Sequence, residues 1–266
     1  MKHAAKKSLG QNFLKSKKAL SDMVNAGKVS KGDTVLEIGP GKGALTEVLL
    51  QHAGKVVAIE KDKRLIPLLE EKFAGEITNG RLELIYGDIL EERIELPKNY
   101  KLIANIPYYI TGALFRMFLE AENKPNTIVF LVQKEVAERA VAKDGKESLL
   151  SLSIKAYGTP KYISKVSKQY FSPVPKVDSA IVAVYDISSD NFKKAGVSEK
   201  QFFRVIKTGF AAKRKVLAKN LSEIAPKDVV HKACADFGLD AKVRAEDLPM
   251  PAWLALTKAL SSYIHS

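Results

Sequence analysis

The stretch VLEIGPGKGALT, at residues 35–46, decides the fold. It begins with apolar residues typical of a buried strand and ends with the apolar spacing of a helix, so its glycines lie in the turn between the two. In a doubly wound α/β sheet, ligands bind at such a turn, beyond the carboxyl end of a strand. Gly39, Gly41 and Gly43 let the backbone approach a ligand closely. The stretch therefore predicts a Rossmann-like sheet with a ligand site at this turn.

The residues on either side continue the same pattern. Short apolar runs alternate with segments of helical spacing, which is typical of a mostly parallel sheet covered by helices. We expect strands at 34–38, 55–60, 81–86, 100–105 and 126–133, and helices at 44–53, 63–73 and 111–120. A helical stretch at 134–157 then precedes two closing strands, 161–167 and 178–187, for which antiparallel pairing is one option.

The chain changes character after residue 187. Residues 188–198, SSDNFKKAGVS, are polar with one glycine and are typical of a linker. The remaining sequence has helical spacing throughout, at 199–209, 213–222, 226–237 and 251–264. We therefore predict two domains: a doubly wound α/β domain over 1–187, which includes a basic N-terminal segment, and a small all-helical domain over 188–266.

The composition limits the classes of protein to consider. No run of about 18 apolar residues occurs, so no membrane span is expected. The N-terminus lacks an apolar stretch of signal-peptide length. Cys234 is the one cysteine in the sequence, and no Cys/His cluster has the spacing of a metal site. We expect a cytoplasmic protein without a metal or an internal disulfide.

The net charge of +13 is concentrated at the two ends of the chain. Residues 1–31 hold eight lysines and one acidic residue, whereas residues 32–186 hold 21 basic and 21 acidic residues. Residues 187–266 hold 14 basic and eight acidic residues. Such a distribution favours binding to a polyanion, most often a nucleic acid. Solvated, lysine-rich helix faces are the alternative.

Three cofactors compete for the glycine turn. A P-loop requires Ser or Thr after Gly-Lys, whereas Gly43 stands there. Nicotinamide dinucleotides favour the spacing G-x-G-x-x-G, whereas the spacing here is G-x-G-x-G. Glu37, two residues before the first glycine, would also oppose a pyrophosphate. S-adenosylmethionine has no phosphate and carries an ammonium and a sulfonium, so the acidic turn favours this cofactor.

Two further carboxylates follow neighbouring strands. Glu60 ends the second strand, 21 residues after Gly39, where an acidic residue can bind both hydroxyls of a ribose. Asp88 ends the third strand and can accept a hydrogen bond from the exocyclic amine of adenine. A solvated or capping acid is common at any one such position. Three acids at three consecutive strand ends favour S-adenosylmethionine binding.

The fourth strand ends in Asn105-Ile106-Pro107-Tyr108, across the sheet edge from the glycine turn. An amino group conjugated to a purine is a poor nucleophile, because its lone pair is delocalised into the ring. The Asn105 side-chain oxygen and a carbonyl of the following turn, which Pro107 would fix, could accept its protons and localise that pair. Tyr108 would stack on the base. The alternative is an ordinary strand end at which the tyrosines pack.

These motifs, taken together, identify a resemblance that covers nearly the whole chain. GQNFL (10–14), VLEIGPGKGALT, YGDIL (86–90), ANIPYYI (104–110) and FSPVPKVDSA (171–180) resemble the ribosomal RNA adenine N6,N6-dimethyltransferases of the KsgA/RsmA type. The resemblance implies S-adenosylmethionine as cofactor. It implies cofactor-binding roles for Asn12, Leu14, Gly39, Glu60, Asp88 and Asn105. It also implies that Phe171 sandwiches the target adenine opposite Tyr108, although from the residues alone Phe171 fits a core position equally well.

The resemblance also implies the substrate. The family forms two adjacent dimethyladenosines near the 3′ end of 16S rRNA during assembly of the small ribosomal subunit, so small-subunit precursors are the expected partner of a monomeric enzyme. Four basic residues of the helical domain fit contacts with phosphates, which supply affinity but no sequence information: Lys213, Arg214, Lys215 and Lys219. A solvated helical face is the alternative for each.

Three rival functions share parts of this pattern. A large-subunit (23S) rRNA methyltransferase of antibiotic resistance would share every cofactor and NxPY feature, but PKVDSA and the longer helical part resemble the small-subunit enzymes. A DNA adenine methyltransferase would use the motif D/N-P-P-Y, whereas this chain has Ile106 at the second position. A non-catalytic protein in ribosome assembly or transcription would have no physical need for Glu60, Asp88 and Asn105 together.

Overall fold

The computed structural model describes residue 6, residues 10–212 and residues 214–264, which form two compact units. The first unit contains the residues up to Ala137 together with Pro160–Ile187. The second contains Glu138–Thr159 and the residues from Ser188 onward. One limit thus coincides with the predicted boundary after residue 187, whereas the segment Glu138–Thr159 belongs to the second unit and not to the first.

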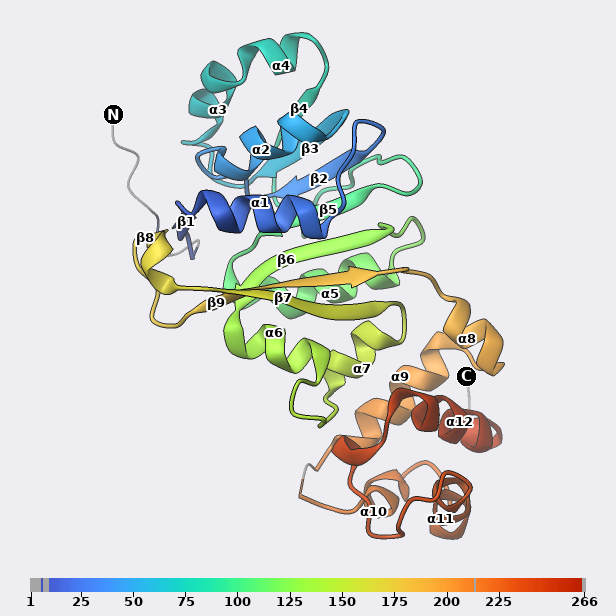
Figure 1. Cartoon of the computed structure of the whole chain (residues 1–266). Helices are drawn as coiled ribbons and strands as arrows, with labels where there is room; N and C mark the ends of the chain where they lie inside the picture. Colours follow the sequence, from blue (N-terminus) through green and yellow to red (C-terminus); the bar gives the residue numbers. More distant parts are fainter. Residues whose placement is uncertain (1–5, 7–9, 213, 265–266) are drawn as a thin grey trace. The chain divides into compact units, whose positions relative to one another are not determined.

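Within the described residues, seven strands form one sheet in the order β4–β3–β2–β5–β6–β9–β7 (Figure 1). The pairs β4–β3, β3–β2, β2–β5 and β5–β6 are parallel, and β9 pairs with β6 in antiparallel orientation. The strands are β2 (Thr34–Ile38), β3 (Lys55–Glu60), β4 (Leu82–Tyr86), β5 (Lys101–Asn105), β6 (Thr127–Gln133), β7 (Thr159–Val166) and β9 (Ser179–Tyr185). The first five differ from the predicted strands by at most one residue at either end.

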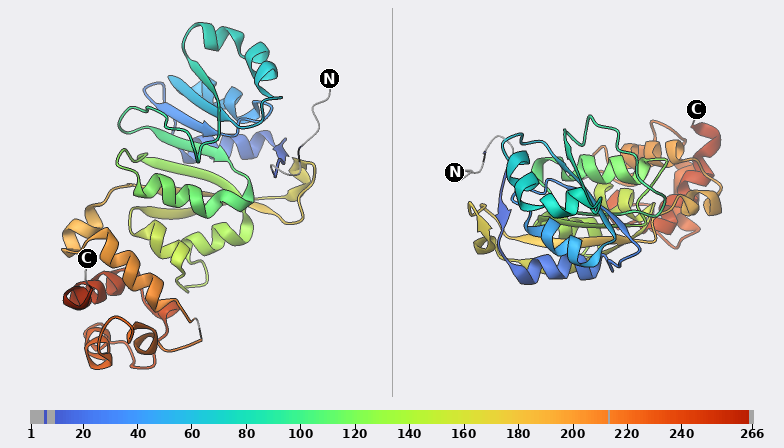
Figure 2. Two further views of the ribbon diagram at one scale, coloured as in Figure 1. Left: turned by 180° about the vertical axis from the view of Figure 1, so that it is seen from behind. Right: turned by 90° about the horizontal axis from the view of Figure 1, so that it is seen from above.

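Helices cover both faces of this sheet. Helix α1 crosses one face in Figure 1, whereas α5 lies on the opposite face, which is turned to the viewer on the left of Figure 2. Because both faces are covered, the central strands are apolar almost without interruption, and β6 is fully buried from Ile128 to Val132. The helices of this unit are α1 (Lys17–Ala26), α2 (Ala44–His52), α3 (Ile66–Lys72), α4 (Ala74–Thr78) and α5 (Thr111–Glu120).

A second, two-stranded sheet joins the N-terminal segment to a distant part of the chain. Strand β1 (Phe13–Leu14) pairs in antiparallel orientation with β8 (Phe171–Ser172). The Lys15 amide extends this contact by donating to the carbonyl of Tyr170 at 2.8 Å. Helix α1 follows directly, capped by the Ser16 hydroxyl, which accepts from the Ala19 amide. A strand pairing thus anchors the segment that precedes α1.

The helical stretch predicted at 134–157 consists of two helices. Helix α6 (Lys134–Val141) reaches from the first unit into the second, and α7 (Leu149–Lys155) lies in the second. Gly145, with a φ of +78°, and Ser148, which forms a capping box with Ser151, separate them. The sequence pattern did not resolve this break.

The second unit is helical, as predicted, but the predicted linker is not a loop. Residues Asp190–Ala195 form helix α8, in which Phe192 is 3% exposed. Its ring lies edge-on to Tyr157 and Phe202, with centroids 5.2 and 5.5 Å away. One buried aromatic side chain in a polar segment thus anchors α8 to its unit. The other helices are α9 (Glu199–Gly209), α10 (Leu217–Leu221), α11 (Lys227–Ala235) and α12 (Met250–Leu260).

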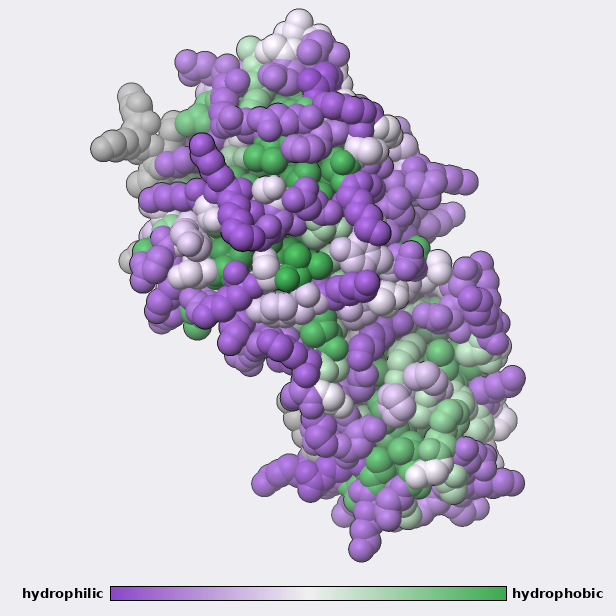
Figure 3. Space-filling model, viewed as in Figure 1, coloured by the Kyte–Doolittle hydropathy of each residue, from purple (hydrophilic) through white to green (hydrophobic). Residues whose placement is uncertain are grey.

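The face of the protein that Figure 3 shows is largely hydrophilic. Figure 3 shows one face on which hydrophilic side chains surround separate apolar patches. Among the described residues, no helix is both long enough and apolar enough to cross a membrane.

The ring of Phe192 provides a test of the helical unit. We expect Phe192→Ala to lower the free energy of unfolding by roughly 3–5 kcal/mol, because the substitution leaves a cavity among three other aromatic rings. Denaturant unfolding of the purified protein measures this loss. Phe237→Ala is the control, since Phe237 is 44% exposed, and should cost less than about 1 kcal/mol. Equal losses in the two variants would contradict the anchoring of α8.

Candidate functional site

The carboxyl edge of the parallel strands gathers the predicted polar residues. The glycine turn follows β2, Glu60 ends β3, Asp88 follows β4 and Asn105 ends β5. These strands are neighbours in the sheet, with Glu60 paired to Tyr86 and Ile38 to Ile59. Side chains far apart in the sequence therefore lie around one cavity of about 310 Å³.

Most of the predicted site residues line this cavity. They are Asn12, Leu14, Glu37, Gly39, Gly41, Glu60, Asp88, Asn105, Pro107 and Tyr108. The two predicted residues of the first unit that do not line it are Gly43 and Phe171. Gly43 has a different role, because a Cβ there would lie 2.4 Å from the Phe73 ring. This glycine lets α2 begin against Phe73, and its φ of +74° suits it to the turn.

Phe171 departs from the prediction that it contacts a base in the cavity. Its side chain is 2% exposed and lies in the core cluster of the first unit, together with its strand partner Leu14. The pairing of β1 with β8 directs this ring into the core, while the next residue, Ser172, lines the cavity. In this structure the core alternative for Phe171 therefore holds.

Glu60 is fixed by backbone donors on both of its carboxylate oxygens. The Gly41 amide donates to Oε2 at 3.0 Å, and the Asp62 amide donates to Oε1 at 2.8 Å. Burial raises the pKa of Glu60, although these two amides favour its charged form. The glycine turn and Glu60 are thus held together by a hydrogen bond.

Glu37 is a buried acid, and one of its carboxylate oxygens has no hydrogen-bond partner among the described residues. Its side chain is 1% exposed, and no donor among the described residues bonds to Oε2. Burial raises the pKa of Glu37 to about 8, the charge of Glu60 adds to the effect, and Thr46 opposes it. An unpaired carboxylate oxygen in a cavity wall is a ready acceptor for a cationic ligand group.

Asp88 has a protein partner of its own. Its carboxylate forms an ion pair with the Lys61 ammonium and accepts from the Leu90 amide at 3.1 Å. Burial opposes ionisation, but the Lys61 contact prevails and lowers the pKa of Asp88. Lys61, directly after β3, was not predicted as a site residue, because its sequence position does not show that its side chain reaches the next strand end.

Asn105 is oriented by the N-terminal segment. Its Nδ2 donates to the Asn12 carbonyl at 3.2 Å. No donor among the described residues bonds to its Oδ1, so this oxygen is free to accept from a ligand. Asn12, predicted only from the resemblance, thus acts on Asn105 through its backbone.

Tyr108 lies in the short helical turn Tyr108–Ile110, which Pro107 begins. Its hydroxyl is hydrogen-bonded to the fully buried Ser179 at 2.8 Å, and its carbonyl accepts from the Thr111 hydroxyl at 3.1 Å. Burial raises the pKa of Tyr108, so the phenol stays neutral. These bonds fix the backbone and the hydroxyl of Tyr108, whose side chain forms part of the cavity wall.

The predicted basic residues lie in the second unit. Arg214, Lys215 and Lys219 are exposed, whereas Lys213 lies outside the described residues. The buried Asn220 shapes this loop, since its Nδ2 donates to the carbonyls of Gly209 and Ala212 at 2.6 and 3.1 Å. The charged side chains thus extend from a backbone that one buried amide holds in place.

The strand order and the cavity at the carboxyl edge define a Rossmann-like methyltransferase fold, and solved structures agree. A dimethyladenosine transferase from Plasmodium falciparum superposes with a TM-score of 0.81 at 26% identity, over 94% of this chain and 98% of that chain. The 23S rRNA methyltransferase ErmE superposes with a TM-score of 0.79 at 26% identity, over 94% of this chain and 100% of that chain.

Sequence comparison identifies the family. The profile of the family described as ribosomal RNA adenine dimethylase matches residues 2–262. The ribosomal RNA small subunit methyltransferase A of Dehalococcoides mccartyi (strain CBDB1) is 44% identical over 258 residues, which is 95% of this chain and 87% of that protein. The chain therefore belongs to the ribosomal RNA adenine dimethylase family.

The raised pKa of Glu37 predicts a pH-dependent stability. An unfolded carboxyl ionises above about its usual 4.5, whereas the folded Glu37 stays neutral up to about 8, so the protein without ligand loses stability as the pH rises between these values. Glu37→Gln should remove this loss. We expect the variant to gain on the order of 3 kcal/mol relative to the wild type between pH 4.5 and pH 8.

Denaturant unfolding at a series of pH values measures the effect. Glu83→Gln provides the control, because the Glu83 side chain is 50% exposed and pairs with Lys55 at the surface. If the curves for Glu37→Gln and the wild type run parallel, Glu37 is not a neutral buried acid.

Proposed function

We propose that this protein is an S-adenosylmethionine-dependent rRNA adenine N6,N6-dimethyltransferase of the small ribosomal subunit. The observation that carries the proposal is the oriented Asn105 carboxamide. Its nitrogen is engaged by the Asn12 carbonyl, and Asn105 lines the same cavity as Glu37, Glu60 and Asp88. A fixed acceptor beside an acidic cofactor cavity suits methyl transfer to an amino group.

The residues of the cavity fit S-adenosylmethionine. Glu60 would accept from the ribose hydroxyls and Asp88 from the adenine amine, once Lys61 gives up its contact. The unpaired oxygen of Glu37 suits the cationic part of the cofactor. Gly39, with a φ of +68° and nothing within 4 Å of the position a Cβ would take, leaves the room that a close ligand needs. Bound here, the cofactor would supply an electrophilic methyl group.

The protein would position the amino nitrogen of the target adenine and localise its lone pair on that nitrogen. In the proposal Asn105 Oδ1 accepts from one N–H, and a carbonyl of the following turn, such as that of Ile106, accepts from the other. These acceptors would favour a tetrahedral amino nitrogen, whose localised lone pair could then accept the methyl group that the cofactor would supply. The displaced proton leaves to water. Alignment accounts for much of the rate, so no strong general base is needed.

Tyr108 is assigned to stack on the target adenine. Its hydroxyl bond to Ser179 supports this role, because a ring held at both ends is a preorganised platform. The proposal does not use Phe171 as a second platform, since its ring is in the core.

Relatives named for the small subunit favour 16S rRNA as the substrate. The D. mccartyi protein, at 44% identity, carries that name, whereas the 23S enzyme ErmE is 26% identical. The large-subunit alternative is therefore not favoured. A non-catalytic role is not favoured either, because the cavity retains Glu60, Asp88 and Asn105 together.

The exposed basic residues of the second unit are assigned to rRNA phosphates near the target. The proposal takes the enzyme to be a monomer that acts on small-subunit precursors in the cytoplasm. The direct test is transfer of labelled methyl groups to undermethylated small subunits, with mass spectrometry to map the modified nucleotides. Label on large subunits, or on no RNA, would contradict the proposal.

Asn105→Ala separates chemistry from cofactor binding. We expect the rate of methyl transfer to fall by roughly 10²–10³-fold, because an acceptor aimed at the reacting nitrogen is lost. Calorimetric titration should show an S-adenosylmethionine affinity within about threefold of the wild type. A parallel loss of affinity and rate would disprove the assigned role of Asn105.

Arg214→Gln with Lys215→Gln tests the basic loop. Loss of two phosphate contacts should weaken RNA binding and lower the slope of log K against log salt by roughly one to two. Lys227→Gln with Lys232→Gln removes the same charge from exposed positions on α11 and is the matched control. If both double variants show the same salt slope, the loop charges are ordinary solvated surface.

A further inference from the structure

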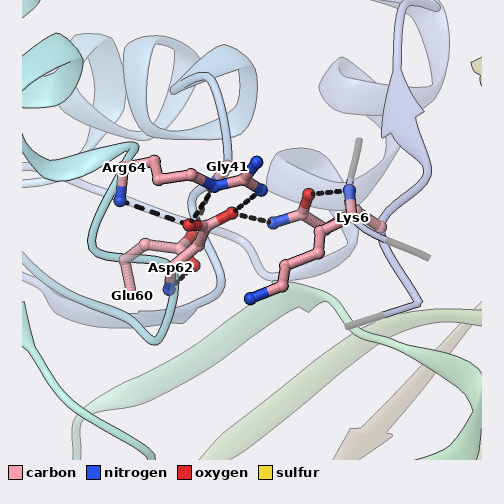
Figure 4. A network of polar contacts seen from close by, with 6 residues as sticks. Lys6, Gly41, Glu60, Asp62 and Arg64 are labelled. Atoms are coloured by element: carbon pink, nitrogen blue, oxygen red, sulfur yellow. Dashed lines mark hydrogen bonds and ion pairs between the residues drawn. The ribbon is translucent and has the colours of Figure 1, made fainter. Parts of the chain in front are cut away.

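A network of hydrogen bonds reaches the cavity at Gln11 and Glu60, and none of the assigned roles explains it. It connects residue 6 of the N-terminal segment to Glu60 through Gln11 and Asp62, with Arg64 at its edge (Figure 4). The Gln11–Asp62 bond joins residues 51 positions apart in the sequence.

Asp62 is the centre of this network. Its amide donates to Glu60 Oε1, and its own carboxylate is 4% exposed. Arg64 holds that carboxylate with two bonds, from Nε to Oδ1 at 2.9 Å and from Nη2 to Oδ2 at 2.6 Å. The Arg64 guanidinium accordingly keeps the pKa of Asp62 well below its usual range, despite opposing burial. Asp62 is therefore a charged, rigid acceptor directly behind Glu60.

Gln11 connects this acceptor to the N-terminal segment. Its Nε2 donates to Asp62 Oδ2 at 2.8 Å, and its Oε1 accepts from the Lys6 amide at 2.7 Å. Both ends of the carboxamide are thus engaged. Gln11 can keep this orientation only while the segment remains against the cavity.

The same segment orients the side chain of Asn105. Asn12, the next residue, offers the carbonyl that accepts from Asn105 Nδ2. Phe13 lies against the glycine turn, where a Cβ on Gly41 would approach its ring to 3.0 Å. Residues 10–14 therefore contact Asp62, whose amide holds Glu60, and they also contact the side-chain amide of Asn105.

From this geometry we infer that Gln11 and Asp62 are a positioning pair that couples occupancy of the cofactor site to the orientation of Asn105. The inference rests on the proposed function and deepens it. A ligand bound to Glu60 orders the turn at Asp62. Asp62 in turn holds Gln11, and residues 10–14 then hold the side-chain amide of Asn105. Neither Gln11 nor Asp62 reacts; both act through their neighbours.

The test is a four-member cycle in which donor and acceptor are exchanged. Gln11→Glu places a carboxylate against Asp62 and repels it, and Asp62→Asn removes the charge that Gln11 and Arg64 share. In the double variant, Gln11→Glu with Asp62→Asn, the carboxamide introduced at position 62 can donate to the carboxylate introduced at position 11. That carboxylate still accepts from the Lys6 amide, so the bond between positions 11 and 62 returns in reversed form. Arg64 Nη2, which donates to Asp62 Oδ2 in the wild type, loses that acceptor and can pair with the introduced carboxylate instead. Gln51→Glu, at an exposed position on α2, is the matched control for the added charge.

Two quantities are measured on the full chain for each variant. One is the S-adenosylmethionine dissociation constant by calorimetry, and the other is the single-turnover rate of methyl transfer at saturating cofactor. We expect each single variant to lose about tenfold in both, and the reversed pair to recover to within about threefold of the wild type. Hydrogen exchange at residues 10–14 should slow on cofactor binding in the wild type and the reversed pair, and not in the single variants.

Several results would overturn the inference. One is a change of less than about twofold in the single variants. Another is a loss that the reversed pair does not recover, and a third is a loss of affinity with an unchanged saturated rate. In each case the wild type would still transfer methyl groups and Asn105→Ala would still be slowed as predicted above, so the proposed function would stand. A wild type that neither binds the cofactor nor transfers a methyl group would overturn both.

Discussion

Parallel pairing of β2, β3, β4 and β5 is the constraint on which the site depends. Parallel strands end at the same edge of a sheet, so residues that come directly after them meet without any loop having to bring them together. The register Ile38↔Ile59 and Glu60↔Tyr86 places the glycine turn beside two acids, and β5 adds Asn105. A slip of one residue along a strand would turn these side chains to the opposite face of the sheet.

Local pattern and strand order were enough to predict the sheet and most of the cavity. The apolar runs located the parallel strands to within one residue, and the position of Glu60 and Asp88 after consecutive strands placed them at one cavity. The contacts of Gln11 with Asp62 and of Lys61 with Asp88 could not be predicted, because they depend on side-chain reach between distant segments.

Two aromatic residues show where local pattern fails. Helix α8 was missed because one buried ring, Phe192, decides it within a polar stretch. Phe171 was assigned to the base-binding site by resemblance, and the β1–β8 pairing that buries its ring leaves no local signal in the sequence. In both cases a contact between distant segments, and not the residue's own neighbours in sequence, determines where the ring lies.

The division into two units separates two physical tasks. The first unit must bury charged groups beside a cofactor, which requires a rigid sheet edge and backbone donors such as those on Glu60. The second presents positive charge to water, where a long-range attraction needs little precision. Yet its loop is not loosely built, because Asn220 anchors two carbonyls from inside the unit. If these residues contact rRNA phosphates, as proposed, an ordered backbone beneath the charged side chains would limit the conformational entropy lost on binding.

The ion pair between Lys61 and Asp88 bears on turnover. Two adenines, each methylated twice, would require repeated exchange of spent for fresh cofactor on one RNA. At each exchange Asp88 would lose an adenine amine, and Lys61, more than half exposed and carried on a flexible stem, stands ready to replace it. The Asp88 carboxylate would then have a hydrogen-bonding or charged partner both with and without the cofactor. Under the proposed function, Lys61 would therefore replace the adenine amine and ease release of the spent cofactor, at a modest cost in cofactor affinity.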